Sequence, residues 1–275
     1  MGALLGNRMS VFDSPEWLQF PPPENSAIGH IHLCRVSEST VTHMIQLPRL
    51  VSLVRQVRQT HCEVEVGVEA LALAERLYSS SLTSAIDIAM TEYGEWVLSL
   101  DEKLAQYYRT SFEYVDASVF ESVVRYCAVR ILLLGLCRAL GEIFPFSPAF
   151  DAVALNEEEL RCASLIAASV QYAETQTQPF PIGTLIMALP LQVAFGTWWR
   201  RHRSEPWSHE DGDWELDRAI FMQEYCLEKR NSMIGMCNGD ALSAGKLQMW
   251  VEGMEGGPWD DVMRESFTTV EDAVF

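Results

Sequence analysis

Two apolar segments with helical spacing, separated by a break that contains proline and glycine, constrain the fold of this chain most. They occupy residues 161–199, and the break lies at residues 176–183. No charged residue interrupts the apolar face of either segment, so each face must be buried against the rest of the protein. The residues on the two faces are Cys162, Leu165, Ile166, Ser169 and Tyr172, then Leu185, Leu189, Val193, Phe195 and Trp199. We therefore expect a buried helical hairpin with other helices packed around it.

The rest of the chain is also dominated by helical spacing. Apolar stripes run from about residue 39 and through residues 64–78, and residues 119–143 are apolar around most of the helix circumference. No alternating pattern typical of a strand exceeds five residues. We predict an all-α fold, an irregular multi-helix bundle around the central hairpin. A single domain over residues 1–255 precedes an acidic, aromatic tail over residues 256–275.

Polar residues and prolines predict where several helices begin and end. Asp116 or Ser118 is placed to cap the long apolar helix, and Asn156 with Glu159 has the spacing of a capping box. Pro190 predicts a kink or a restart in the second helix of the hairpin. The predicted caps of the last two helices are Asp213 and Asp240.

The acidic composition limits the partners of this chain. Its 275 residues are 48% hydrophobic, which is typical of a globular protein, and carry a formal net charge of −18. Such a charge repels phosphate backbones, so we expect no direct nucleic-acid binding by this chain alone. The densest basic cluster, formed by Arg200, Arg201 and Arg203, is interpreted as a solvated helix end whose cations offset the helix dipole.

The cysteines and the longest apolar run indicate a reduced protein that does not enter a membrane. The seven cysteines are odd in number and form no CxxC pair, which favours buried thiols over a disulfide framework. The apolar run at residues 131–137, between Arg130 and Arg138, is far too short to span a bilayer. We therefore predict no membrane partner.

Four stretches, spread over nearly the whole chain, resemble one protein family in their order and residues. LLGNRMSVFDSPEW lies near the start, CASLIAASVQY and GTLIMALPLQVAFGTW lie in the hairpin, and GGPWDDVM lies near the end. Similar segments occur in fungal transcription regulators of the Zn(II)2Cys6 binuclear-cluster class. In those proteins such a region is the helical regulatory domain that follows the DNA-binding cluster.

The cysteine-rich cluster of that family, with its CxxC spacing and basic flanks, is absent from this sequence. The resemblance therefore implies a regulatory scaffold without DNA recognition. It implies a nuclear, or nuclear and cytoplasmic, location and an association with a fungal secondary-metabolite gene cluster. The implied partners are the transcription machinery or a full-length regulator. The alternative is that the same helical scaffold serves as a secondary-metabolism enzyme, a cyclase or isomerase.

Candidate ligand-binding residues are few. In an extended segment His30, His32 and Cys34 would point to one side and offer two imidazoles and a thiolate to zinc, although spacing alone does not establish the required tetrahedral geometry. The preferred interpretation is an ordinary loop, so we expect no metal and no cofactor.

Four tryptophans close in the sequence are the candidate lining of a pocket for a small hydrophobic ligand: Trp198, Trp199, Trp207 and Trp214. Packing in the core is the other interpretation, because aromatic side chains dominate cores. In the tail, acidic residues alternate with apolar ones, a composition typical of segments that fold on a partner protein, although a frayed terminus fits equally well. The candidate contacts there are Trp259, Asp260, Asp261, Met263 and Phe267.

Motifs that carry catalysis or nucleotide binding are absent. The sequence contains no GxSxG elbow, no GxGxxG and no Walker A loop. Asp260 and Asp261 lack the third carboxylate of a DDxxD magnesium site, because Arg264 occupies that position. The sequence therefore favours a binding and regulatory protein over an enzyme.

Overall fold

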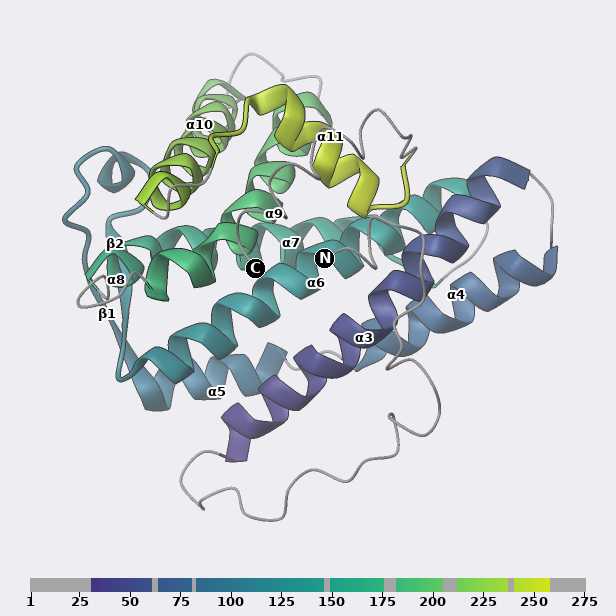
Figure 1. The fold of residues 1–275 in the computed structure, drawn as a ribbon, viewed down its shortest axis with the longest axis horizontal. Coiled ribbons are helices and arrows are strands. Elements are labelled where there is room, and N and C mark those ends of the chain that lie inside the picture. Colours follow the sequence, from purple (N-terminus) through teal and green to yellow (C-terminus); the bar gives the residue numbers. More distant parts are fainter. Residues whose placement is uncertain are drawn as a thin grey trace.

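The computed structural model describes residues 31–60, 64–80, 83–145, 149–175, 182–204, 212–236 and 240–257. Over these residues the chain is all-α, with one small sheet (Figure 1). Helix α6 (Ala117–Ile143) lies at the centre and is buried along nearly its whole length. A helix that is apolar on all sides requires neighbours on all sides, and α6 packs against helices that precede it and helices that follow it in the chain.

The start of α6 confirms one of the two predicted caps. Asp116 has an extended backbone, and its carboxylate accepts hydrogen bonds from the amides of Ser118, at 2.8 Å, and Val119, at 2.9 Å. These bonds satisfy donors that have no partner within the helix. Ser118 lies inside the first turn instead.

Helices α3 (Ile31–Thr60) and α4 (Val64–Ser79) cover one side of α6. The predicted start of α3 near residue 39 is wrong, and so is the extended segment at residues 31–34, because the helix begins at Ile31 and contains Pro48 in its interior. Buried Leu33 and Val36 extend the apolar stripe toward the N-terminus, so packing against the bundle supports the longer helix. The boundaries of α4 agree with the prediction to one residue.

The segment between α4 and α6 contains both helical and strand structure. Helix α5 (Thr83–Tyr93) leads into strand β1 (Gly94–Leu98), which pairs antiparallel with β2 (Thr110–Tyr114), and the short 3-10 helix η1 (Leu104–Gln106) lies between the strands. Trp96 lies opposite Phe112, with the ring centroids 5.1 Å apart in an edge-to-face arrangement. These two short strands leave the all-α class unchanged.

The predicted hairpin is formed by α7 (Ala152–Ala168), the short α8 (Val170–Thr175) and α9 (Ile182–Ser204). All five residues predicted for its first face are buried, and so are Val193 and Phe195 on the second. Leu185 is an exception, with 49% of its surface exposed. The hairpin is thus buried, but α6 occupies the centre of the bundle, because its apolar surface extends around the whole helix.

Two predictions of helix boundaries in the hairpin are wrong. Asp151, not Asn156, caps α7, because its carboxylate accepts a 3.0 Å hydrogen bond from the amide of Val153. Asn156 lies inside the helix, so the capping-box spacing was coincidental. Of the two outcomes predicted for Pro190, the restart is wrong, because α9 continues through this residue to Ser204, and the kink stays a prediction.

Helices α10 (Gly212–Met236) and α11 (Ala244–Met254) lie at the top of Figure 1, and both contact α9. The end of α11 also contacts α3, where Arg55 donates a hydrogen bond to the carbonyl of Gly253. Asp213 lies within α10, and Ser243, not Asp240, caps α11 by accepting a hydrogen bond from the amide of Lys246. Gly196 lets α9 and α11 approach closely, since a Cβ there would lie 2.4 Å from Val251 Cγ1. Within the described residues no helix has the length and apolar character needed to cross a bilayer.

Candidate functional site

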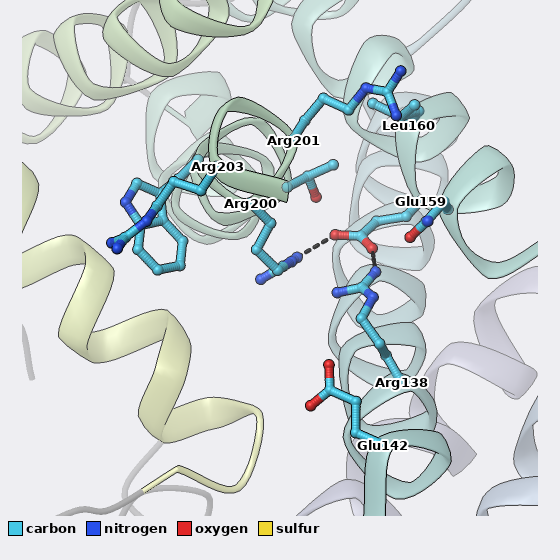
Figure 2. Close-up of a pocket in the computed structure, with 10 residues that line it drawn as sticks. Arg138, Glu142, Glu159, Leu160, Arg200, Arg201 and Arg203 are labelled. Carbon is cyan, nitrogen blue, oxygen red and sulfur yellow. Dashed lines mark hydrogen bonds and ion pairs between the residues drawn. The ribbon is translucent and has the colours of Figure 1, made fainter. Parts of the chain in front are cut away.

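A pocket of about 310 Å³ opens where the C-terminal half of α9 passes α6 and the middle of α7. We call it the arginine pocket, because four of its described lining residues are arginines. Helix α6 contributes Arg138 and Glu142, α7 contributes Asn156, Glu159 and Leu160, and α9 contributes Thr197, Trp199, Arg200, Arg201 and Arg203. Its volume is at the lower end of the range for small-molecule sites. Figure 2 shows that the lining comes from all three helices, with Arg138 and Arg200 pointing toward Glu159.

Glu159 is the centre of the charge arrangement. Its side chain is only 3% exposed, and the guanidinium groups of Arg138 and Arg200 each pair with one of its carboxylate oxygens. In Figure 2 the two arginines approach Glu159 from α6 and α9. A buried carboxylate needs such partners, because burial removes its hydration. The three residues therefore connect α6, α7 and α9 through one buried ion-pair network.

A fourth element reaches the same network from the end of α11. Arg200 Nη1 donates to Glu255 Oε1 at 2.6 Å, so this arginine is shared between Glu159 and Glu255. Glu255 is able to reach it because Gly135 of α6 has no side chain; a Cβ at that position would lie 2.5 Å from the same carboxylate oxygen. The absent side chain thus leaves room for the ion pair.

Carboxylates beside the pocket balance its positive charge. Four arginines and two glutamates line the pocket among the described residues, and Glu255 and Glu215 pair with Arg200 and Arg201 from outside the lining. Burial, and then the charge of Arg200, lower the pKa of Arg138 to about 10, although Glu255 and Glu142 act in the opposite direction. The lowered pKa therefore reflects first the loss of hydration on burial and then repulsion by Arg200.

Two polar groups of the pocket residues have no partner. The hydroxyl of Thr197, in a residue only 3% exposed, makes no hydrogen bond, and neither does the buried Nε of Arg200. Buried polar groups are normally hydrogen-bonded, so each unsatisfied group requires an explanation. Both groups belong to residues that line the same pocket, and neither has a hydrogen-bond partner among the described residues.

The outer part of the pocket combines aromatic surface with further charge. The Arg203 guanidinium lies over the Trp199 ring, 4.9 Å from its centroid, and Arg201 pairs with Glu215 of α10 at 2.6 Å. In Figure 2 Arg201 and Arg203 extend away from Glu159. The sequence interpretation of these arginines as a solvated helix end therefore describes Arg203 well, but Arg200 points into the protein.

The tryptophans predicted to line a pocket lie in different surroundings. Trp199 lines the arginine pocket, and Trp198, on the same helix, is buried in the core. Trp214 is 52% exposed, and the Arg218 guanidinium lies between it and Trp198, 5.3 and 5.2 Å from the two ring centroids. Trp207 lies outside the described residues.

The weak zinc candidates do not form a described site. Cys34 is on helix α3, whose start at Ile31 removes the extended geometry on which the hypothesis depended; two residues along a helix differ by about 200° in direction. His30 and the side chain of His32 lie outside the described part of the chain. Within that part, no group of three histidines, cysteines or acidic residues is arranged to hold a metal ion. The tail candidates, from Trp259 to Phe267, also lie outside it.

The sequence reasoning did not identify Arg138, Glu159 or Thr197 as site residues. One signal was present: Glu159 is three and seven positions before Cys162 and Ile166, so it lies on the apolar stripe of α7. A charge on a buried stripe indicates an ion pair or a site. Its partners were not identifiable, because they come from other helices.

Comparison with known proteins gives no match: no protein-family model, no curated protein and no solved structure is similar to this chain. The arginine pocket is therefore the main guide to what the chain binds.

Proposed function

We propose that this chain is a helical regulatory module that acts by binding, taking a small ligand in the arginine pocket and engaging other proteins. The observation that carries this proposal is the character of the pocket. It has the size of a ligand site, and its charges are held in place by the Glu159 network. Guanidinium groups do not release protons at physiological pH, so they suit anion binding better than proton transfer.

The resemblance to fungal binuclear-cluster regulators agrees with this proposal in one respect. Two of its segments, CASLIAASVQY and GTLIMALPLQVAFGTW, lie in α7–α8 and α9, and the second includes the pocket residue Thr197. Under the proposal the chain works in the nucleus, or the nucleus and cytoplasm, on a secondary-metabolite gene cluster. Because its net charge is −18, it acts through the transcription machinery or a full-length regulator and not by gripping DNA itself.

The test is deletion of the gene in its host, followed by transcript and metabolite profiling of the same cultures. A regulator predicts changed transcript levels across a group of biosynthetic genes. Accumulation of one pathway intermediate with unchanged transcripts would overturn the proposal and favour the cyclase or isomerase alternative.

A second arm uses the full chain fused to an unrelated DNA-binding domain upstream of a reporter. A change in reporter output relative to the DNA-binding domain alone supports the regulatory role, and an unchanged output opposes it.

A further inference from the structure

We infer that the arginine pocket binds a small organic monoanion, a carboxylate on a flat apolar body, and that this anion displaces Glu255 from Arg200. This ligand class belongs to the binding site of the proposed function. Only the regulatory role of binding rests on that proposed function. Binding itself is tested on the purified chain.

The charge of the site favours a monoanion. Arginine guanidinium groups are the preferred partners of carboxylates and phosphates. However, Glu142 and Glu159 remain among the lining residues and would repel a phosphate dianion more strongly than a single carboxylate. A ligand with one negative charge takes the place of the single Glu255 carboxylate at Arg200 and meets less repulsion than a dianion.

The unpartnered groups determine where the carboxylate head lies. Thr197 and Arg200 are separated by three positions on α9, so both are on the same side of the helix. Thr197 offers a hydroxyl that has no partner, and Arg200 offers its Nη1 once Glu255 leaves, as well as its unpartnered Nε. A carboxylate held by Arg200 and Thr197 satisfies donors that the protein alone leaves incomplete.

The remaining lining residues accommodate an apolar body. Trp199 and Leu160 supply aromatic and aliphatic surface beside the charged groups. Ligand sites generally combine such surface with a few fixed polar groups. The limited volume of about 310 Å³ restricts the ligand to a small molecule, on the scale of one or two rings.

Glu255 acts as an internal competitor. Its carboxylate occupies Arg200 Nη1 at 2.6 Å, in the manner in which a ligand carboxylate would. Glu255 directly follows α11, and the acidic tail continues from this point. Displacement of Glu255 therefore links occupation of the pocket to the C-terminal end of α11.

The experiment is calorimetric titration of the full-length chain with benzoate at constant ionic strength. We expect a dissociation constant of about 1 mM, as for a well-placed fragment of this size. Benzamide, the neutral analogue, should bind at least tenfold more weakly, and so should inorganic phosphate. Equal binding of benzamide, tighter binding of phosphate, or no heat with benzoate to twenty times that concentration would overturn the inference.

Two variants locate the binding. Glu255→Gln removes the competing charge and should tighten benzoate binding about fivefold, whereas Thr197→Val removes one hydrogen bond and should weaken it about fivefold. The matched controls are Glu69→Gln, in an exposed ion pair with Arg49, and Thr91→Val, on an exposed part of α5. Neither control should change the affinity.

Far-ultraviolet circular dichroism confirms that each variant is folded before titration. If Glu255→Gln leaves benzoate affinity unchanged or weakens it, the competition is refuted. If benzoate does not bind while the reporter fusion still responds, the ligand class is wrong but the regulatory function stands. If benzoate binds but the reporter fusion does not respond, the ligand class stands and the regulatory function is wrong.

Discussion

Replacement of Glu159 by glutamine is the most direct test of the charge network. The substitution preserves the shape of the side chain but removes the negative charge shared by Arg138 and Arg200. Glu159 is 3% exposed, and the two arginine side chains are 21% and 18% exposed, so water replaces little of the lost interaction. Two guanidinium groups would then face each other without the carboxylate between them.

The magnitude follows from the burial. Removing one partner of a fully buried ion pair costs about 3–5 kcal/mol. Here the partial exposure of both arginines and the remaining Arg200–Glu255 pair reduce that figure, so we expect a loss of about 2–4 kcal/mol in the free energy of unfolding. Because the network is largely buried, added salt should restore little of the stability.

Urea unfolding at pH 7, followed by circular dichroism and tryptophan fluorescence, measures this loss. Glu69→Gln is the matched control, since Glu69 pairs with Arg49 at 2.5 Å on the surface and is 47% exposed. Exposed pairs contribute about 0.5 kcal/mol or less. The two probes must give coincident transitions for the free energies to be compared.

The reasoning is refuted if Glu159→Gln destabilises the chain no more than Glu69→Gln does. A quadruple variant adds a second check. Replacing Glu159, Arg138, Arg200 and Glu255 together by methionine removes all four charges of the network, so none of them is left without its partner. Replacing a whole buried network is often nearly neutral, and the quadruple variant should therefore be more stable than Glu159→Gln.

Two further predictions concern stability. Burial, and then the charge of Arg130, lower the pKa of His43 from 6.5 to about 4; the unfolded chain therefore binds a proton in this range that the folded chain does not, and stability falls with decreasing pH. His43→Gln should reduce that fall in the free energy of unfolding between pH 7 and 4.5 by up to about 3 kcal/mol relative to the wild type, as measured by urea unfolding. A pH profile of stability unchanged from that of the wild type would contradict this prediction. Gly196→Ala, against Val251, should lower the unfolding free energy by about 1–3 kcal/mol, whereas Gly141→Ala, with no atom within 4 Å of its Cβ, should raise it by about 0.5–1 kcal/mol; equal effects would refute the packing argument.

The helices of this protein were largely predictable from sequence, and their exact ends were not. The apolar circumference of residues 119–143 indicated a buried helix, and α6 is that helix. Asn156 and Pro190 were misleading because local signals compete with packing. Asp151 provides the actual cap of α7, and helix packing on both sides of α9 accommodates a proline that would disrupt an isolated helix.

The short sheet shows the opposite limitation. Strands β1 and β2 are five residues each, which is too short for an alternating pattern to stand out. They are stabilised by pairing with each other and by aromatic contacts such as those between Trp96 and Phe112 and between Phe112 and Tyr114. Such contacts across a connection are not visible in a local sequence window.

The sequence by itself determined that this protein is helical, acidic and contains a buried apolar hairpin, because helical periodicity and net charge are properties of neighbouring residues and of composition. Only the tertiary structure decided which charges meet. Arg138, Glu159, Arg200 and Glu255 are far apart in the chain and belong to α6, α7, α9 and the end of α11. Their convergence around one pocket depends on how these helices cross, and crossing geometry is fixed by side-chain packing over the whole bundle.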